Sequence, residues 1–332
     1  MKNRRYLLFA GLLATFFGFV NLAEQTPVQL AVPPYFPAPY YDFSKNPLTR
    51  EGIELGRRLF YDPILSKDST VSCASCHLSF TAFTHVDHAL SHGIHDRIGR
   101  RNSPALMNLA WASHFMWDGA ISHLDFQALG PISDSVEMDN KIEKLVEKLS
   151  VTPRFPPMFR AAFGDEKITG ERVLKAMSQF ELTLVSANSK YDRMVHGVDS
   201  FSVQEKNGYQ LFQKNCARCH TEPLFTNGGF EKNGLPMDSL LRDAGRMRIS
   251  QNPTDSLKFK VPTLRNIEFS YPYMHDGRCR KLRDVLNHYT SPAAADLGIS
   301  LSANEKVDLT AFLLTLTDRE FLFNPDFSFP KN

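Results

Sequence analysis

The chain has 332 residues, with 38 lysines and arginines against 36 aspartates and glutamates. Hydrophobic residues make up 42% of it and charged residues 22%, which excludes a disordered, collagen-like or polytopic membrane protein. At roughly 150 residues per domain, this length predicts two domains with cores of their own.

The first 23 residues carry the pattern of a secretory signal. Three basic residues precede an apolar run over residues 6–20, the order of a signal peptide's charged and hydrophobic regions. We expect cleavage near Ala23, with an uncleaved N-terminal membrane anchor as the alternative. Both interpretations export the rest of the protein. Once those three charges leave, 35 basic residues remain against 36 acidic ones, so we expect no nucleic-acid partner.

Two C-x-x-C-H strings, over residues 73–77 and 216–220, are the strongest motifs. This is the pattern for covalent attachment of a c-type haem, in which two cysteines bind the porphyrin and the histidine binds its iron. At this composition about 0.002 such strings are expected by chance. A disulfide pair, a redox dithiol or a zinc knuckle would leave both histidines without a role. The two predicted haem sites are Cys73, Cys76 and His77, and Cys216, Cys219 and His220.

The remaining elements are predicted to be mainly helical. Apolar residues at helical spacing and two capping boxes, Ser202-x-x-Glu205 and Ser302-x-x-Glu305, mark the helices between and after the motifs. Segments rich in proline and glycine predict loops that wrap large prosthetic groups. Helices are expected near 140–150, 170–187 and 303–317, and loops at 84–103 and 223–262.

An internal repeat surrounds the two motifs. A P-x-L-x-N string at Pro104 precedes M-W-D-G, and the same string at Pro262 precedes M-H-D-G, with 14 residues from proline to aspartate in both. This match predicts duplication of one haem-binding unit. Trp117 takes the place of His275, so we expect the two haems to differ in role. The predicted fold is mainly α, with two class I cytochrome c-like haem domains and long loops. Their predicted bounds are 24–188 and 189–332.

With these motifs and the segments F-M-W-D-G and Y-P-Y-M-H-D-G, residues 47 to 320 resemble the bacterial dihaem cytochrome c peroxidases and their MauG relatives. The resemblance implies a periplasmic peroxidase with two covalent haems, the first reacting with hydrogen peroxide and the second receiving electrons. It implies a small electron donor, a cytochrome c or a cupredoxin, and a homodimer. Trp117 would conduct electrons between the haems.

The resemblance also implies the residues around the first haem. Glu137 would move the peroxide proton as a base and then an acid, and Gln127 would orient the peroxide by hydrogen bonding. A histidine of the loop over 91–102, either His92 or His95, would bind the resting iron. Asn102, with the backbones of Ser270 and Pro272, matches the family's calcium site, where Ser270 replaces the usual threonine.

The ligand of the second haem departs from the peroxidases, which place a methionine where this chain has Tyr289. MauG relatives carry tyrosine there, and a phenolate favours the higher oxidation states of iron. Tyr289 could instead pack beside the haem while Met237, Met247, Met274 or His288 binds the iron. The other histidines, His85, His88, His114, His123 and His196, are predicted to be surface or structural residues.

Three functions follow as hypotheses. The leading one is a peroxidase that reduces hydrogen peroxide with electrons from a small redox protein. A MauG-like oxidase acting on a partner protein is favoured by Tyr289, although Lys214 stands where MauG has the tryptophan through which electrons leave its substrate. A dihaem electron carrier without catalysis is the third, and it would leave Glu137 without a task.

Overall fold

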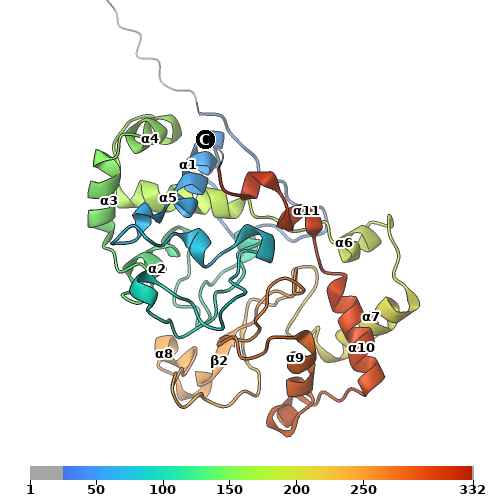
Figure 1. Ribbon diagram of the computed structural model, residues 1–332. Coiled ribbons are helices and arrows are strands. Elements are labelled where there is room, and N and C mark those ends of the chain that lie inside the picture. The colour runs from blue at the N-terminus through green and yellow to red at the C-terminus, as the bar shows by residue number, and fades with distance from the viewer. Residues whose placement is uncertain (1–24, 331–332) are drawn as a thin grey trace, which may run out of the picture.

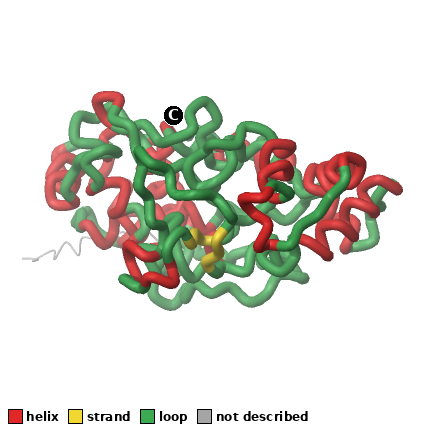
Figure 2. Tube along the Cα trace, turned by 90° about the horizontal axis from the view of Figure 1, so that it is seen from below, coloured by secondary structure: helices red, strands yellow, loops and turns green. Residues whose placement is uncertain are grey.

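The computed structural model describes residues 25–330, so the predicted signal segment lies outside the described residues. Helices gather at two ends of the molecule, and loops fill the region between them (Figures 1 and 2). No helix in this range is both long and apolar enough to cross a membrane. The mainly helical prediction is confirmed. The α-helices are α1 (Arg50–Tyr61), α2 (Leu129–Ser133), α3 (Ile142–Val151), α4 (Phe155–Phe163), α5 (Gly170–Leu182), α6 (Lys190–Val195), α7 (Val203–Asn215), α8 (Met247–Ser250), α9 (Leu282–Tyr289), α10 (Ala303–Leu314) and α11 (Arg319–Leu322).

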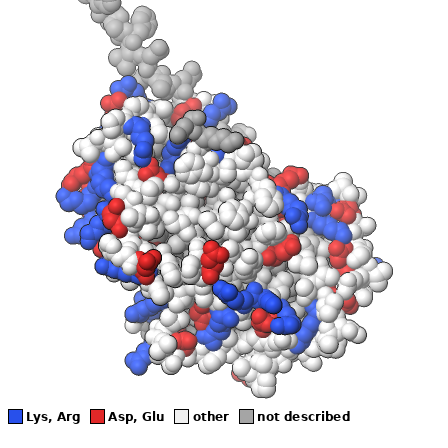
Figure 3. All heavy atoms as spheres, in the orientation of Figure 1, with Lys and Arg blue, Asp and Glu red and all other residues white. Residues whose placement is uncertain are grey.

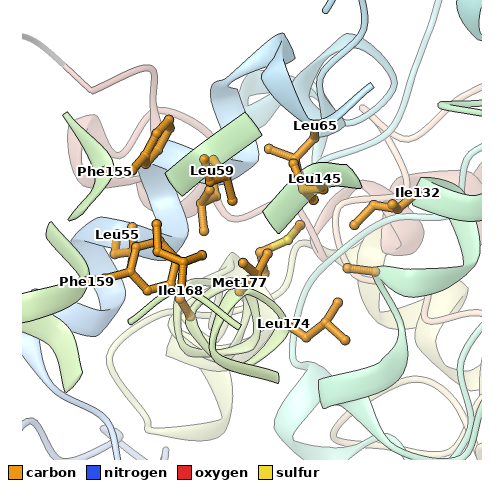
Figure 4. Close-up of a cluster of buried hydrophobic side chains, with 14 of the residues drawn as sticks. Leu55, Leu59, Leu65, Ile132, Leu145, Phe155, Phe159, Ile168, Leu174 and Met177 are labelled. Atoms are coloured by element: carbon orange, nitrogen blue, oxygen red, sulfur yellow. The ribbon is translucent and has the colours of Figure 1, made fainter. Parts of the chain in front are cut away.

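Helices α1 and α5 cross at the centre of the N-terminal half. Each begins at a threonine cap: Thr49 accepts a hydrogen bond from the Gly52 amide, and Thr169 from the Arg172 amide. At the crossing, a Cβ on Gly56 would lie 1.9 Å from the carbonyl oxygen of Ala176, so only glycine allows this approach. Buried side chains from α1, α3, α4 and α5 pack around the crossing (Figure 4). Burial of each large apolar side chain contributes about 1.5–3 kcal/mol.

Helices α7 and α10 cross in the same way in the C-terminal half. Both predicted capping boxes are present, at Ser202 and at Ser302. A Cβ on Gly208 would lie 1.9 Å from the carbonyl oxygen of Asp308, and Phe312 is fully buried in the surrounding cluster. The second crossing therefore repeats the close contact of the first.

The two crossings also match in sequence, beyond the repeat found above. The string F-E-L-T-L over 180–184 on α5 corresponds to F-L-L-T-L over 312–316 on α10. The Asn108 amide donates to Leu184 O at 2.8 Å, and the Asn266 amide donates to Leu316 O at 3.0 Å. Each P-x-L-x-N asparagine is thus tied to the end of the helix in its own half.

The central region contains a small antiparallel sheet of β1 (Phe230–Lys232) and β2 (Lys258–Lys260). It lies between the helical ends of the molecule (Figure 2). The predicted loop over 223–262 is mostly loop but also contains these strands and the short helix α8, which are too short to show a periodic pattern.

The C-terminal segment returns to the N-terminal half and ends beside α1 (Figure 1), where Arg57 Nε donates to Ser328 O at 2.9 Å. Phe321 packs 6.0 Å from the Phe83 ring, and the Tyr61 hydroxyl donates to Phe327 O at 2.6 Å. Residues on both sides of the predicted boundary at 188/189 thus share one cluster. The surface facing the viewer in Figure 3 carries interspersed charges of both signs.

Candidate functional site

The first motif forms a tight turn directly after Ser72. The amides of Cys76 and His77 both donate to Cys73 O, at 3.1 and 3.0 Å, which gathers the three side chains. His77 Nδ1 lies 2.7 Å from Phe83 O, so the neutral ring donates its Nδ1 proton there and keeps Nε2 as a free electron pair. Burial lowers the pKa of His77 to about 4, which keeps the imidazole in the neutral form that binds a metal.

The second motif has the same construction. The amides of Cys219 and His220 donate to Cys216 O at 3.1 and 2.9 Å. His220 Nδ1 lies 3.2 Å from Phe225 O and 3.1 Å from Pro262 O, and burial lowers the pKa of this histidine. All five cysteines are unpaired in this structure. Two thiols beside an imidazole with a free Nε2 fit a covalently bound haem at each motif.

A cavity of about 640 Å³ extends from the second motif to the Trp117 segment. Its wall includes Cys216, Cys219 and His220, together with residues of both halves of the chain. The cavity therefore connects the second predicted haem site with the predicted electron conduit.

Trp117 is held between a loop of its own half and a strand of the other. Its Nε1 donates to Asn102 O at 2.8 Å, and its carbonyl accepts from the Lys260 amide at 2.7 Å. The Asn102 amide donates to His275 O, also at 2.7 Å. Asn102 and Lys260 each precede a repeat proline by two residues, so these backbone bonds pair equivalent positions across the two halves.

Glu137 lies beside the first motif. Its carbonyl accepts from the Ile94 amide at 2.8 Å, and its charge raises the pKa values of both Cys73 and Cys76, which are themselves raised mainly by burial. Burial, with a smaller contribution from Asp134, raises the pKa of Glu137 to about 7. A carboxyl group with that pKa can both accept and donate a proton near neutral pH.

Gln127 is oriented towards the segment that carries Trp117. Its Nε2 donates weakly to Met116 Sδ at 3.8 Å, and among the described residues it forms no hydrogen bond with Glu137. Glu137 thus lies near Cys73 and Cys76 of the first motif, whereas Gln127 contacts Met116, the residue before Trp117.

The two candidate histidines of the loop over 91–102 have different environments. The carbonyl of His92 lies 3.5 Å from Cys76 Sγ, and its ring lies 4.2 Å from that of His88. The His95 side chain is 63% exposed and lies 3.8 Å from Asp68. His92 is therefore the better-placed candidate, and its role as a ligand stays a prediction.

Tyr289, the last residue of α9, lines the cavity. Burial, with the neighbouring Cys216 and Cys219, raises the pKa of its hydroxyl. Of its competitors, His288 uses Nε2 on Asn233 O at 2.7 Å. Met274 lines the cavity, whereas Met237 and Met247 are absent from its wall.

The three residues of the predicted calcium site all line the same cavity: Asn102, Ser270 and Pro272. Asn102 is buried and uses Nδ2 to donate to Ala89 O at 3.0 Å, so its side-chain oxygen is not the atom engaged there. An amide oxygen and backbone carbonyls are oxygen donors of the type that calcium prefers.

Three further residues escaped the sequence analysis. Lys260 and His114 line the cavity, and Glu181 is a buried carboxyl group on α5. Burial, with a smaller contribution from Asp125, raises the pKa of Glu181 to about 8. Extending the repeat would have found two of them, because Lys260 corresponds to Asn102, and Glu181 to Leu313. His114 was predicted to be a surface or structural residue, and its place in this wall leaves that prediction untested.

The comparisons agree with the geometry of the two motifs. The family described as di-haem cytochrome c peroxidase matches residues 50–200. The methylamine utilization protein MauG of Methylorubrum extorquens is 36% identical over 290 residues, covering 82% of this chain and 79% of the relative. Cytochrome c551 peroxidase of Nitrosomonas europaea is 34% identical, covering 86% and 84%.

A solved structure of a MauG-like protein associated with microbial copper homeostasis superposes with a TM-score of 0.84. It is 31% identical, and the match covers 91% of this chain and 99% of that one. Two haem c groups are the cofactors that such a family implies, and both motifs fit them. The chain belongs to the dihaem cytochrome c peroxidase and MauG family, and it is a peroxidase-type oxidoreductase.

Proposed function

We propose that this protein reduces hydrogen peroxide to water at a haem held by Cys73, Cys76 and His77. Electrons from a small redox protein would enter at a second haem, held by the cysteines and histidine of the 216–220 motif. The observation that carries this proposal is Glu137, a partly buried carboxyl group beside the first motif whose pKa is about 7. A second buried acid of the N-terminal half, Glu181 on α5, is also specific to that half, because Leu313 takes its place in the C-terminal half.

The haems would supply the peroxide-binding iron and the reversible storage of electrons. Glu137 would accept the proton of bound peroxide and return it to the departing oxygen. Gln127 would orient the peroxide by donating a hydrogen bond. Trp117 would carry electrons between the two halves, which is supported by its hydrogen bonds to Asn102 and Lys260.

The two halves would be duplicated cytochrome c-like domains that meet near residue 188. The matching glycine contacts at α1–α5 and α7–α10 support this origin, as do the matching asparagine bonds to Leu184 and Leu316. We place the protein in the periplasm, with a cytochrome c or a cupredoxin as electron donor, a calcium ion at Asn102 and a homodimer as the assembly.

The test is steady-state reduction of hydrogen peroxide by the two-haem protein with a reduced cytochrome c as donor. Free haem at the same iron concentration is the control. We expect turnover well above that control, and turnover equal to it would contradict the proposal. EPR spectra of the ferric and half-reduced forms test whether a loop histidine binds the resting iron of the first haem and leaves it on reduction. If the wild type shows a low-spin signal that disappears on half reduction, and His92→Ala lacks this signal in the ferric form, His92 is assigned as the resting ligand.

A MauG-like oxidase is the second candidate, and Tyr289 is the observation that favours it. Its hydroxyl is buried near both cysteines of the second motif, where it could bind the iron as a phenolate. Lys214, at the position of the MauG tryptophan, is exposed and offers no aromatic exit for a hole. A stable species two equivalents above ferric, formed by peroxide in the wild type and lost in Tyr289→Met, would establish this candidate. Its absence from the wild type would exclude it.

A further inference from the structure

Two polar side chains of the cavity wall lack a partner. His275 is 6% exposed, and its Nδ1 is the one buried side-chain nitrogen or oxygen among residues 25–330 without a hydrogen bond. Lys260 Nζ forms no hydrogen bond or ion pair with another described residue. Burial lowers the pKa of Lys260 to about 8, and no neighbouring acid opposes this shift.

Both side chains belong to the wall of one cavity, and both are attached at β2 or packed on it. The Phe259 ring stacks on the His275 ring at 3.7 Å with an interplanar angle of 13°, and Lys260 is the next residue of β2. Both side chains line the cavity that also contains the cysteines of the second motif.

Three nearby carboxylates are already paired with arginines, and Glu231, the acid of the cavity wall, is exposed and forms no ion pair with Lys260. Asp276 accepts from Arg278 Nε at 2.7 Å, and Arg101 bridges Asp118 at 2.8 Å and Asp243 at 2.6 Å. None of these acids therefore neutralises Lys260.

Lys260 also differs from the other cations of the cavity wall. Lys214, Arg218 and Lys232 are exposed and remain solvated, whereas Lys260 is partly buried. An unpaired ammonium group and an unused imidazole nitrogen in the wall of one cavity are both suited to carboxylates. A haem attached at Cys216 and Cys219 brings two carboxylates, its propionates, into this cavity.

We propose that Lys260 Nζ and His275 Nδ1 bind the propionates of the haem attached at Cys216 and Cys219. The ammonium charge then favours the reduced iron and raises the potential of this haem relative to a site without it. The inference depends on the haem of the proposed function, but not on peroxidase activity, so it can hold even if the protein does not turn over peroxide.

The experiment is a potentiometric titration of the two-haem protein, followed optically, with the other haem as an internal reference. Lys260→Met is expected to lower the reduction equilibrium constant of the second haem about tenfold, which is ~59 mV for one electron. Lys232→Met removes the same charge from the facing strand at an exposed position, so its shift should be much smaller. Lys260→Arg should restore the wild-type potential. If Lys260→Met does not fold, Lys260→Gln is titrated in its place.

Resonance Raman spectra give a second readout that separates propionate binding from a general packing role. His275→Phe keeps the stacking on Phe259 and removes the nitrogen, so it should shift a propionate bending band of one haem. Equal potentials for Lys260→Met and Lys232→Met, or unchanged propionate bands in both Lys260→Met and His275→Phe, would overturn the proposal.

Discussion

The two motif regions have the same backbone arrangement but differ in the side chains around the motif. In both, two crossed helices meet at a glycine, and the motif histidine donates Nδ1 to a backbone carbonyl. Glu137, with its pKa near 7, lies beside the first motif, whereas Tyr289 lies beside the second. The shared backbone supports cofactor attachment, and the loops supply the chemistry that distinguishes the sites.

Equivalent positions make this difference concrete. In the repeat, Asn102 corresponds to Lys260 and Trp117 corresponds to His275. The Asn102 amide donates to His275 O and the Lys260 amide donates to Trp117 O, both at 2.7 Å, so the two backbone hydrogen bonds are equivalent although the side chains differ. A symmetric frame thus carries an asymmetric set of polar groups. The following changes test either the frame or the asymmetry.

Glu137→Gln should have the largest effect on activity. Loss of the proton-transferring group is expected to lower kcat/KM for peroxide about 10²–10⁴-fold. In the wild type, kcat/KM should rise with pH to an inflection near 7 as Glu137 ionises, and the variant should lack this inflection.

Asp134→Asn is the matched control for Glu137. The Asp134 charge helps to raise the pKa of Glu137, so its removal should move the inflection to lower pH while activity is kept. Stopped-flow rates measured from pH 5 to 9 check both variants. An unchanged pH profile in Glu137→Gln would contradict the assignment.

The shared frame is tested by Gly56→Ala and Gly208→Ala. Each added methyl group would lie 1.9 Å from a backbone oxygen that cannot move without its helix, so each should cost about 3 kcal/mol. Gly130→Ala is the control, since its Cβ would meet Ile121 at an ordinary 3.4 Å. Chemical denaturation of the three variants measures the free energies of unfolding. A large loss in only one of the two crossings would contradict the equivalence of the halves.

Glu181→Gln tests an acid that the second half replaces with Leu313. The pKa of Glu181 is raised from 4.5 to about 8, so its contribution to stability is present at low pH and is lost as pH rises through 8. The wild type should therefore lose about 2–3 kcal/mol of unfolding free energy more than the variant between pH 6 and 9. Glu171→Gln, at an exposed position of the same helix, should keep the wild-type slope. Parallel slopes for Glu181→Gln and the wild type would show that Glu181 does not titrate in this range.

Trp117→Phe should have the smallest effect on stability. Loss of the 2.8 Å bond to Asn102 O is expected to cost about 1 kcal/mol, measured by denaturation. Electron transfer between the haems should slow on the order of tenfold, about 1.4 kcal/mol in the barrier. Flash reduction of the second haem measures this rate, and an unchanged rate would place the electron route elsewhere.

Much of this protein was predictable because its signals are local in sequence. The C-x-x-C-H turns need only five consecutive residues, and the capping boxes at Ser202 and Ser302 need four. The loop over 223–262 was harder, because its three-residue strands form only when β1 finds β2 across 25 residues of intervening chain. Lys260 was missed for the same reason, since its strand is positioned by the carbonyl of Trp117, far away in the sequence.

The sequence alone determined the helical class and predicted the haem attachment sites and the repeat between the two halves, because each is encoded by short-range chemistry or by repetition. Only the tertiary structure decided which polar groups lose water and which meet. Burial brings the pKa of Glu137 close to neutral. The packing of the loops leaves the His95 side chain exposed to solvent, and it leaves Lys260 and His275 unpaired in the wall of one cavity. Desolvation depends on the packing of distant segments, and no local pattern of residues encodes it.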